Sequence, residues 1–513
     1  MSAITSFVVS SMQFFSALLI FLLGVLIIAV IYMYFRDITQ TENTIRKNYP
    51  VVGRFRYLFE HLGEFFRQYF FAQDREEMPF NRAERSWVYR AAKGVDNTVA
   101  FGSTRNMFAN GTILFENTPY PTLDEHAAKP SELIIGKDYC VQPFHTHSLF
   151  NISGMSYGAI SKPAIRALSA GAAKAGAWLN TGEGGLSDFH LEGGCDLVFQ
   201  IGTAKYGVRD ADGSLSESRL KELAAIEQIR MFEIKISQGA KPGKGGILPG
   251  IKVSKEISEI RGIPQDEDSI SPNRHVEVEN DDALLELIHK IRTLTGKPVG
   301  IKAVLGGNLW ITRLCQKIQE KGLDYAPDFF AVDGGDGGTG AAPMSLMDTV
   351  GLPLRESLPF LMNELHRFKL KDRIIVIASG KLINPPEVAW ALCTGADFVV
   401  SARGAMMALG CIQAMQCNRN TCPTGITTHD KKLQRGLDVT KKSERVARYI
   451  DQMVHEIGVI SHSVGLKEPR ALGREHARMM GEDGTSTELT TLYPYPNYHI
   501  NTHKMTERLD KAS

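Results

Sequence analysis

The sequence predicts an α/β chain built around a TIM (β/α)8 barrel, preceded by an apolar transmembrane helix and carrying helical extensions. Three observations lead to this fold class. Eight short apolar runs alternate with helical stretches between residues 149 and 402, glycines gather where these runs end, and the first 35 residues carry no charged side chain. Eight such units match a barrel of about 250 residues. An open, doubly wound sheet would alternate in the same way, and the number eight favours the barrel.

Continuous apolar runs indicate strands that are buried on both faces, as parallel strands are. The eight runs are 149–153, 177–181, 197–202, 231–237, 298–304, 329–333, 374–379 and 398–402. The helices expected between them include 161–175, 281–294, 309–321, 344–368 and 386–394. The barrel with its loops is therefore placed at 148–430, followed by a helical tail at 431–513.

Residues 1–36 are predicted to form a membrane anchor. From Phe14 to Tyr34 the side chains are almost all apolar, and about twenty such residues at ~1.5 Å rise cross a hydrocarbon core of roughly 30 Å. Basic residues follow this run instead of preceding it, which disfavours a cleavable signal peptide and places the rest of the chain in the cytoplasm. A buried core helix is the alternative. Residues 37–147 are expected to form a juxtamembrane extension of a single-pass membrane protein.

Composition excludes two classes of protein. The chain has 58 Lys and Arg against 57 Asp and Glu, so its formal net charge of +1 gives no basic field for nucleic acid. Its 7 cysteines show no spaced framework, so a disulfide scaffold is not expected.

Three of these cysteines lie close together, at Cys411, Cys417 and Cys422, and Pro423 follows the last. A short loop lets thiolates converge on iron, and a proline after the last cysteine is familiar in cluster loops. Three ligands suit a three-iron cluster. Three small buried hydrophobes, or zinc with His429 as a fourth ligand, are the alternatives. The other cysteines are expected in the core: Cys140, Cys195, Cys315 and Cys393.

Glycine-rich runs stand where the strands end, which is where such barrels place their chemistry. They are 154–158, 180–185, 233–246, 300–304, 333–341, 378–381 and 401–404. Glycine lets the backbone approach a ligand closely, and the loops after the last strands commonly hold a phosphate. A phosphate-bearing ligand is therefore expected at this end.

Lys302 lies inside an apolar strand, so it should point into the barrel mouth. A buried ammonium costs several kcal/mol unless an anion compensates it. A reduced flavin, anionic near its N1 and C2 carbonyl, would be such a partner, and a structural ion pair with Glu183 or Glu233 is the alternative. The same reasoning applies to Lys235 in the neighbouring strand.

Five motifs in order carry a family resemblance. They are Gly-Met-Ser-Tyr-Gly-Ala-Ile-Ser at 154–161, Asn-Thr-Gly-Glu-Gly-Gly at 180–185, Ile-Lys-Ile-Ser-Gln-Gly-Ala-Lys-Pro-Gly at 234–243, Gly-Gly-Asp-Gly-Gly-Thr-Gly-Ala at 334–341, and the three-cysteine loop. Together they resemble the FMN-binding synthase domain of glutamate synthase, here in a stand-alone, membrane-anchored chain.

The resemblance implies an oxidoreductase acting on CH-NH2 groups, which holds FMN and a 3Fe-4S cluster. It would reduce 2-iminoglutarate, formed from 2-oxoglutarate and ammonia, to glutamate. Glu183 would lie on the substrate side of the flavin to orient the imine or relay a proton, with Lys302 and Lys235 as the other catalytic candidates. The resemblance assigns flavin contacts to Gly154, Met155, Ser156, Tyr157, Gln200 and Lys302, and phosphate contacts to Gly334, Gly335, Gly337, Gly338, Gly380, Arg403 and Gly404.

The chain departs from full-length glutamate synthase, because an anchor stands where the amidotransferase domain would be and no Gly-x-Gly-x-x-Gly motif opens a helix after a strand. We therefore expect free ammonia or a separate amidotransferase subunit to supply nitrogen. A reductase subunit, ferredoxin or membrane carrier would supply electrons.

Three alternatives stay open. One is a synthase acting on a related imine, such as that of N-methylglutamate. Another is a membrane-bound FMN and iron–sulfur electron-transfer module. The third is an FMN-dependent dehydrogenase, which would need a catalytic histidine near a strand end. The candidates are His145, His147 and His190.

Overall fold

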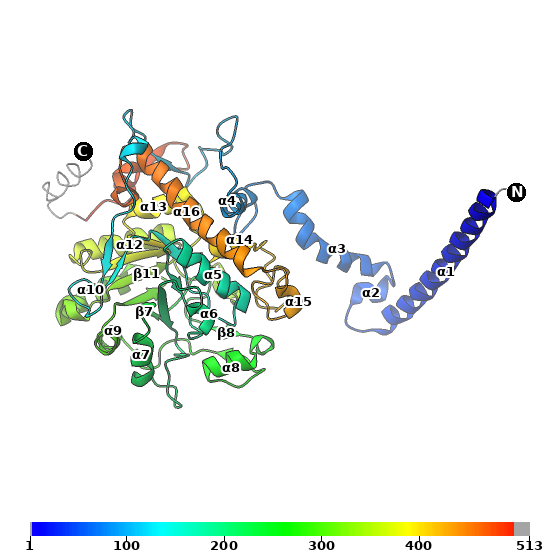
Figure 1. Cartoon of the computed structure of the whole chain (residues 1–513), viewed down its shortest axis with the longest axis horizontal. Coiled ribbons are helices and arrows are strands. Elements are labelled where there is room, and N and C mark those ends of the chain that lie inside the picture. The colour runs from blue at the N-terminus through cyan, green and yellow to red at the C-terminus, as the bar shows by residue number, and fades with distance from the viewer. Residues whose placement is uncertain (1–2, 497–513) are drawn as a thin grey trace. The chain divides into compact units, whose positions relative to one another are not determined.

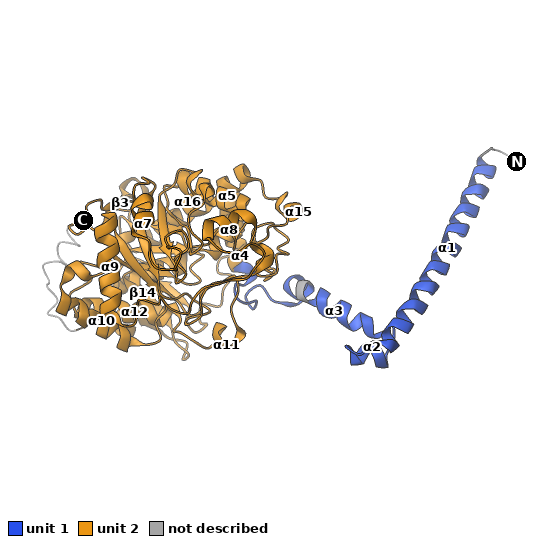
Figure 2. Cartoon of the chain, turned by 90° about the horizontal axis from the view of Figure 1, so that it is seen from below, with its two compact units in different colours: residues 1–83 blue, residues 84–513 orange. Residues whose placement is uncertain are grey.

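The computed structural model describes residues 3–496 and divides into two compact units, residues 1–83 and 84–513, coloured separately in Figure 2. Residues 1–2 of the predicted anchor and 497–513 of the predicted tail lie outside the described part. The first unit holds α1 (Ala3–Thr39), α2 (Thr44–Asn48), α3 (Gly53–Phe66) and a π-helical turn (Arg67–Phe71). Helix α1 is long and apolar enough to cross a membrane. Signal sequences meet the same criterion, so the anchor and its orientation stay predictions.

The second unit contains a closed barrel of eight parallel strands, which confirms the predicted fold class. Each strand overlaps one of the predicted apolar runs. The strands are β4 (Phe150–Ile152), β5 (Leu179–Asn180), β6 (Leu197–Ile201), β7 (Ile229–Lys235), β10 (Val299–Ala303), β11 (Phe329–Asp333), β12 (Ile375–Ser379) and β13 (Phe398–Ser401). They follow one another around the barrel in chain order, and β13 closes it by pairing with β4.

Helices connect the strands on the outside of the barrel (Figure 1). They are α5 (Lys162–Lys174), α6 (Asp188–Leu191), α7 (Glu217–Ala224), α9 (Asp281–Thr295), α10 (Asn308–Lys321), α11 (Met344–Met347), α12 (Leu354–Arg367), α13 (Pro385–Thr394) and α14 (Arg403–Leu409). A 3-10 turn, Leu323–Tyr325, follows α10.

The expectation of one continuous helix over 344–368 is wrong, because two helices flank an extended loop there. Gly351 takes a φ of 92°, and Pro353 stands just before α12. The Leu352 carbonyl accepts the Gly335 N–H at 2.7 Å, and its own N–H donates to Leu305 O at 2.8 Å. These long-range hydrogen bonds hold the segment against the loop that follows β11.

An insertion of about forty residues follows β7 and folds over the carboxyl end of the barrel. It contains β8 (Ile247–Leu248), a 3-10 turn (Gly250–Lys252), α8 (Lys255–Arg261) and β9 (Ser269–Ile270), with β8 and β9 paired antiparallel. Thr203 Oγ1, after β6, donates to Pro272 O at 2.7 Å. The insertion is therefore fastened to a second strand loop of the mouth.

The extensions on either side of the barrel come together. They hold α4 (Arg82–Lys93), β1 (Ile113–Phe115), a 3-10 turn (Asp124–His126), α15 (Lys431–Gln434), α16 (Val439–Ser463), 3-10 turns (Pro469–Ala471 and Arg474–His476), β14 (Ala477–Met480), β15 (Ser486–Glu488) and α17 (Leu489–Leu492). Strand β14 pairs with both β1 and β15. The long helix α16 packs along α5 (Figure 1).

The amino end of the barrel is covered by a hairpin of β2 (Leu133–Ile135) and β3 (Phe144–Thr146). Ile135 and Phe144 from this hairpin are buried in one cluster with Trp178, Phe329 and Phe398. The barrel interior is therefore packed at this end.

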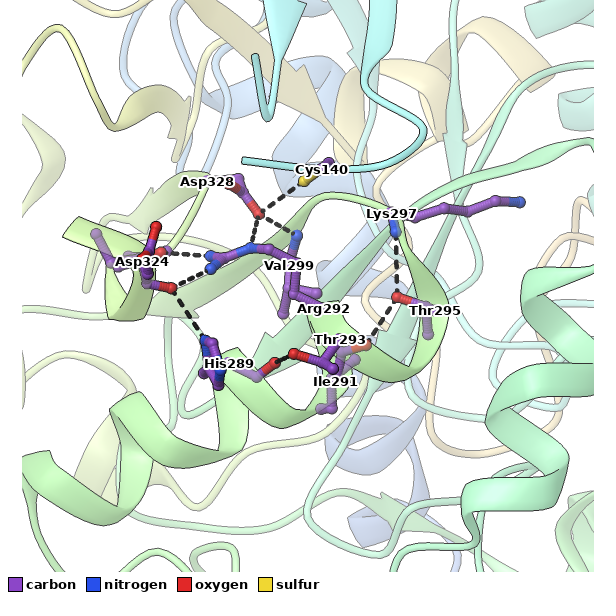
Figure 3. A network of polar contacts seen from close by, with 12 residues as sticks. Cys140, His289, Ile291, Arg292, Thr293, Thr295, Lys297, Val299, Asp324 and Asp328 are labelled. Carbon is purple, nitrogen blue, oxygen red and sulfur yellow. Dashed lines mark hydrogen bonds and ion pairs between the residues drawn. The ribbon is translucent and has the colours of Figure 1, made fainter. Parts of the chain in front are cut away.

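A buried ionic network lies beside this hairpin, and Figure 3 shows its Arg292 and Asp328 groups. Asp328 is fully buried. Its Oδ2 lies 2.8 Å from Arg292 Nε and accepts the Val299 N–H at 2.7 Å, while its Oδ1 lies 2.9 Å from Arg373 Nη1. Cys140 Sγ lies 3.6 Å from the same carboxylate, and burial followed by this charge raises the pKa of the thiol to about 12. Cys140 is therefore held as a neutral thiol beside this carboxylate.

Candidate functional site

The carboxyl ends of β5, β6 and β7 form a buried polar layer. Asn180 Nδ2 and Gln200 Nε2 both donate to Glu233 Oε1, at 2.9 and 2.6 Å. A Cβ on Gly154, at the end of β4, would lie 2.7 Å from Asn180 Oδ1. Glycine is therefore required at position 154 for its backbone to approach this layer, and the predicted flavin contacts Gly154 and Gln200 lie together.

Lys302, at the end of β10, is buried and lies 3.5 Å from Asp333 Oδ2 and 3.4 Å from Ser153 Oγ. Burial disfavours its charge, but the carboxylates of Asp333 and Glu233 hold the pKa of Lys302 above its ordinary value. Lys302 therefore forms its ion pair with Asp333. The sequence had suggested Glu183 or Glu233 as its partner.

Glu183 and Lys235 form a second pair, with 2.8 Å between Oε1 and Nζ. Burial would raise the pKa of Glu183, but the charges of Lys235, Lys241 and Arg261 hold this pKa below its ordinary value. A Cβ on Gly246 would lie 2.6 Å from Glu183 Oε1. The carboxylate is thus ionised and enclosed between strand ends and the insertion.

Two cations near this pair were missed from the sequence. Lys241 is buried, and within the described residues its ammonium has no hydrogen-bond or ion-pair partner. Burial and then Lys235 lower the pKa of Lys241 to about 8, while Glu183 acts in the opposite direction. Arg261 on α8 is also buried and donates to Tyr157 O at 3.1 Å. Lys241 lies inside the motif at 234–243, and that motif was the sequence feature that could have identified it as a site residue.

The loop after β4 borders the same mouth. A Cβ on Gly182 would lie 2.4 Å from Ser156 N, so the two loops touch through their backbones. Met155 and Tyr157 are buried, and Tyr157 donates its hydroxyl to Glu256 Oε2 at 2.6 Å. The segment predicted to border a flavin is therefore held firmly against the Glu183 loop.

The glycine loops after the last three strands also meet. Gly334 N donates to Ser379 O at 2.8 Å, and Arg403 Nη2 donates to Asp336 O at 3.3 Å. A Cβ on Gly338 would lie 2.7 Å from Arg403 Nε. The structure thus brings together the predicted phosphate contacts: Gly334, Gly335, Gly337, Gly338, Gly380, Arg403 and Gly404. A guanidinium among closely packed glycine backbones is a donor set that fits a phosphate.

The three-cysteine loop turns sharply between α14 and α15. Gln413, Met415 and Asn420 take φ values of 58°, 51° and 59°, in the left-handed region that residues other than glycine rarely adopt. Cys411 Sγ accepts the Gln413 N–H at 3.4 Å, and Cys422 Sγ lies 3.3 Å from Thr424 Oγ1. The backbone is therefore bent around the sulfur atoms.

The thiols differ in how readily they ionise. Burial raises the pKa of Cys411 to about 12 and also raises that of Cys417. Burial acts in the same direction on Cys422, but hydrogen bonds from Thr424 and Thr427 hold its pKa below the ordinary value.

Among residues 3–496, no three His, Cys, Asp or Glu side chains converge to hold a metal ion, so the iron–sulfur prediction is not confirmed. Three cysteines within twelve residues of the sequence still suit the thiolate ligation of a cluster by residue type. His429, the fourth ligand of the zinc alternative, has its Nε2 2.8 Å from Gly158 O. That nitrogen is engaged by the backbone, which leaves Nδ1 as the ring nitrogen of His429 that could bind a metal.

Two of the three histidines of the dehydrogenase alternative, His145 and His147, lie away from the mouth described above. His145 lies in β3 at the other end of the barrel, and both His145 and His147 face Glu132 at the surface. His190 is buried in α6, where its Nδ1 lies 2.8 Å from Ser187 Oγ. Another histidine, His275, lies in the insertion with its Nε2 3.0 Å from Lys235 O.

Comparisons with known proteins agree with these observations. The family model for the conserved region in glutamate synthase matches residues 115–467. The chain is 37% identical over 516 residues to the glutamate synthase large subunit-like protein YerD of Bacillus subtilis, covering 93% of this chain and 98% of that protein. It is 34% identical over 333 residues to the archaeal-type glutamate synthase [NADPH] of Thermotoga maritima, covering 64% of this chain and 62% of that protein.

Among solved structures, the monotopic membrane protein (S)-mandelate dehydrogenase aligns with a TM-score of 0.45 and 14% identity. The alignment covers 71% of this chain and 87% of that one. The flavin-binding domain of baker's yeast flavocytochrome b2 aligns with a TM-score of 0.43 and 14% identity, covering 88% of this chain and 90% of that one. The family match spans the whole barrel, and the resemblance noted in the sequence motifs is confirmed. The chain belongs to the glutamate synthase family of oxidoreductases.

Proposed function

We propose that the chain reduces 2-iminoglutarate, formed from 2-oxoglutarate and ammonia, to glutamate, using FMN and a 3Fe-4S cluster. The observation that carries this proposal is a pair of buried cationic residues beside Glu183, Lys241 and Arg261, that form no ion pair among the described residues. Among the described residues Lys241 forms no ion pair or hydrogen bond, and Arg261 donates only to the neutral oxygens Ser269 Oγ and Tyr157 O. A buried cation without an anion is costly, so the mouth favours an anionic ligand.

Two of the three carboxylates of the mouth are already paired with a lysine, and the third is hydrogen-bonded by neutral amides. Glu183 pairs with Lys235, Asp333 pairs with Lys302, and Glu233 accepts from two amides. Lys241 and Arg261, the two cations without an ion-pair partner, would hold the substrate carboxylates. The Glu183 carboxylate would pair with the protonated imine nitrogen, which carries a positive charge. The imine of a dicarboxylate would therefore present its two carboxylates to Lys241 and Arg261 and its positive nitrogen to Glu183.

The cofactors would lie at the two loop clusters. Gly334 to Gly338, Gly380, Arg403 and Gly404 would hold the FMN phosphate, the 154–157 segment and Gln200 would border the ring, and Lys302 would face its anionic edge. Cys411, Cys417 and Cys422 would bind the cluster. FMN supplies hydride chemistry and the cluster supplies single electrons. The protein's own groups position the imine and neutralise its charges.

The reaction balances as one 2-oxoglutarate, one ammonia, two electrons and two protons giving one glutamate and one water. Electrons would come from a separate reductase subunit or ferredoxin, and nitrogen from free ammonia or a separate amidotransferase. We further propose that α1 anchors the chain in a membrane with the barrel in the cytoplasm.

The test is to purify the full chain in detergent, record its flavin and iron spectra, and assay glutamate from ammonia and 2-oxoglutarate with reduced ferredoxin. Glutamate formation that needs both substrates is expected. Oxidation of reduced ferredoxin without glutamate would favour an electron-transfer module, and product formation only with methylamine would favour the N-methylglutamate reaction. A flavin-loaded, iron-loaded protein that forms no amino acid would end the proposal.

Lys241→Met should raise KM for 2-oxoglutarate about 10–100-fold, because a hydrogen bond to a charged group contributes about 1.5–3 kcal/mol. Steady-state kinetics on 2-oxoglutarate measure this. Lys244→Met, an exposed change in the same loop, is the matched control. Equal KM values for the two variants would remove Lys241 from the substrate site.

Cys417→Ser should lose the iron spectrum and retain FMN, since the two cofactors are assigned to different loops. Iron and flavin analyses of the same sample measure both. Cys140→Ser, in the network at the amino end of the barrel, should keep its iron. Full iron content in Cys417→Ser would show that this thiol is not a ligand.

A further inference from the structure

Helix α3 and the π-helical turn that follows it carry an apolar stripe. Positions 55, 58, 59, 62 and 66 are Phe or Leu, and this spacing of three and four residues places them on one face of the helix. The rings of Phe55 and Phe59 have their centroids 6.4 Å apart, and those of Phe66 and Phe70 have theirs 5.3 Å apart. The exposed apolar and aromatic side chains of this segment include Phe55, Leu58, Phe59, Phe66, Tyr69, Phe70 and Phe71. Adjoining exposed apolar groups mark an interaction surface, so the stripe needs an apolar partner.

The opposite side of α3 faces α2. Tyr57 lies about 200° around the helix from Phe59, at 3.6 residues per turn, and the Arg46 guanidinium of α2 lies 4.6 Å from the centre of the Tyr57 ring. A Cβ on Gly53 would lie 2.8 Å from Ile45 O, so the backbones of α2 and α3 touch. Helix α2 therefore covers the back of α3 and leaves the stripe open.

The start of α3 is fastened to the end of α1. Asp37, near the end of α1, is 1% exposed. Its carboxylate accepts hydrogen bonds from Arg54 Nη2 at 2.7 Å, Arg54 Nε at 2.8 Å and the Val51 N–H at 3.0 Å. A bidentate arginine–carboxylate pair fixes geometry as well as adding energy. Helix α2 lies in the elbow between α1 and α3 (Figure 2). The stripe therefore begins close to the point where the apolar helix α1 ends.

The charges around the stripe match an anionic surface. Residues 44–71 hold two acidic residues and five basic ones, which are Arg46, Lys47, Arg54, Arg56 and Arg67. Anionic lipid headgroups attract basic clusters that follow a membrane span, and aromatic rings are favoured at the same level of a bilayer. Two copies of the stripe facing one another would instead bring like charges together, which is unfavourable. A lipid surface therefore fits this segment better than a second copy of the chain.

We propose that α3 and the π-helical turn lie in the plane of a membrane surface, with the stripe among the upper acyl chains and the basic residues at anionic headgroups. Amphipathic helices of this kind place their apolar face about 5–10 Å into the boundary between headgroups and acyl chains. The inference rests on the membrane location proposed above and adds a second membrane contact to α1. The Asp37–Arg54 pair holds this second contact at the end of the first.

The first experiment places a tryptophan reporter in the full-length chain, reconstituted in vesicles of phosphatidylcholine and phosphatidylglycerol. Phe59→Trp puts the reporter in the stripe. Glu60→Trp is the matched control, because Glu60 is exposed on the polar side of α3. The lipids carry bromine on the upper part of the acyl chains, where it quenches only nearby indole rings, and the emission of the wild type is subtracted. The added emission of Phe59→Trp should be lost and that of Glu60→Trp retained, with a smaller loss from Phe59→Trp in brominated phosphatidylcholine alone.

Three results of this experiment would contradict the inference. Equal quenching of Phe59→Trp and Glu60→Trp would show that the stripe has no special contact with lipid. Emission from Phe59→Trp at short wavelength without quenching would show that the barrel or a second copy of the chain covers the stripe. Equal quenching of Phe59→Trp in the two lipid mixtures would overturn the role of the basic residues.

Trypsin cleavage after Arg67 provides a second measurement, made on chains whose barrel faces the outside of the vesicle. Arg67 is exposed in the π-helical turn, and cleavage follows the fraction of time that the segment leaves the surface. Phe59→Asp should raise the cleavage rate about 10–100-fold, the range that corresponds to burial of one Phe side chain. Glu60→Asp places the same residue on the polar side and should match the wild type. Equal cleavage rates in the two variants would overturn the inference.

Extraction with alkaline carbonate separates a failure of this inference from a failure of the α1 anchor. A wild type that stays in the vesicles, while Phe59→Trp is not quenched, keeps the anchor and overturns the role of α3. A wild type that carbonate releases, although Phe59→Trp is quenched at neutral pH, overturns the anchor and supports the surface contact of α3.

Discussion

Glu183→Gln is expected to lower kcat for glutamate formation about 10²–10⁴-fold, the range for loss of a positioned acid–base group. The substitution keeps the size of the side chain but removes the negative charge assigned to the imine nitrogen. It also leaves the Lys235 ammonium, 11% exposed and 2.8 Å away, without its carboxylate. Steady-state kinetics with ammonia and 2-oxoglutarate measure the effect.

Glu267→Gln is the control for this variant, because Glu267 is exposed in the same insertion. Flavin reduction by dithionite should be unchanged in both proteins, since Glu183 is assigned to the substrate and not to FMN. Wild-type kcat in Glu183→Gln would remove the carboxylate from the reaction. An unchanged kcat with a raised KM would restrict its role to binding.

The same pair makes a prediction about pH. Burial disfavours ionised Glu183, but Lys235 and the other cations hold its folded-state pKa below the ordinary value. A lowered pKa contributes stability that is present above the unfolded pKa of about 4.3 and is lost as pH falls through the lower folded value. Wild type should therefore lose more stability than Glu183→Gln below about pH 4, which parallel urea titrations at several pH values would show.

Asp328→Ala is expected to destabilise the barrel by about 3–5 kcal/mol, because it leaves buried Arg292 and Arg373 without their shared carboxylate. The backbone N–H of Val299 also loses its acceptor, at the first residue of β10. Urea unfolding followed by circular dichroism measures the change.

Asp324→Ala is the matched control for the Asp328 network. The Asp324 side chain is exposed, and Arg292 uses only its carbonyl, which the substitution retains (Figure 3). A loss below about 1 kcal/mol is expected there, as for most surface changes. Equal effects of the two substitutions would show that the buried carboxylate does not stabilise the fold.

Strand positions could be predicted because each barrel strand is buried on both faces. A run such as 329–333 is apolar up to its last residue, Asp333, and the strand β11 occupies those same residues. The break in the predicted helix 344–368 could not be predicted in the same way. It depends on hydrogen bonds of Leu352 to Gly335 and Leu305, which adjacent residues in the sequence do not reveal.

The candidate site was likewise predictable only where local sequence determines the position of a residue. Lys302 was predicted from a charge inside an apolar strand, but its partner required the register. Lys302 lies opposite Ala331, so Asp333, two residues further, points to the same face of the barrel. Lys241 and Arg261 belong to the insertion after β7, whose folding over the mouth depends on contacts with distant loops. No local periodicity predicts where such an insertion returns.

The small sheet made of β1, β14 and β15 ties residues 113–115 to residues 477–480 and 486–488. Segments that flank the barrel on opposite sides in the sequence thus complete one another's backbone hydrogen bonds. A shortened catalytic chain that started at residue 148 would leave β14 with a bare edge, whereas one that started at residue 84 would keep its neighbour. A soluble version of this protein should therefore begin before β1, so that β1, β14 and β15 still form one sheet.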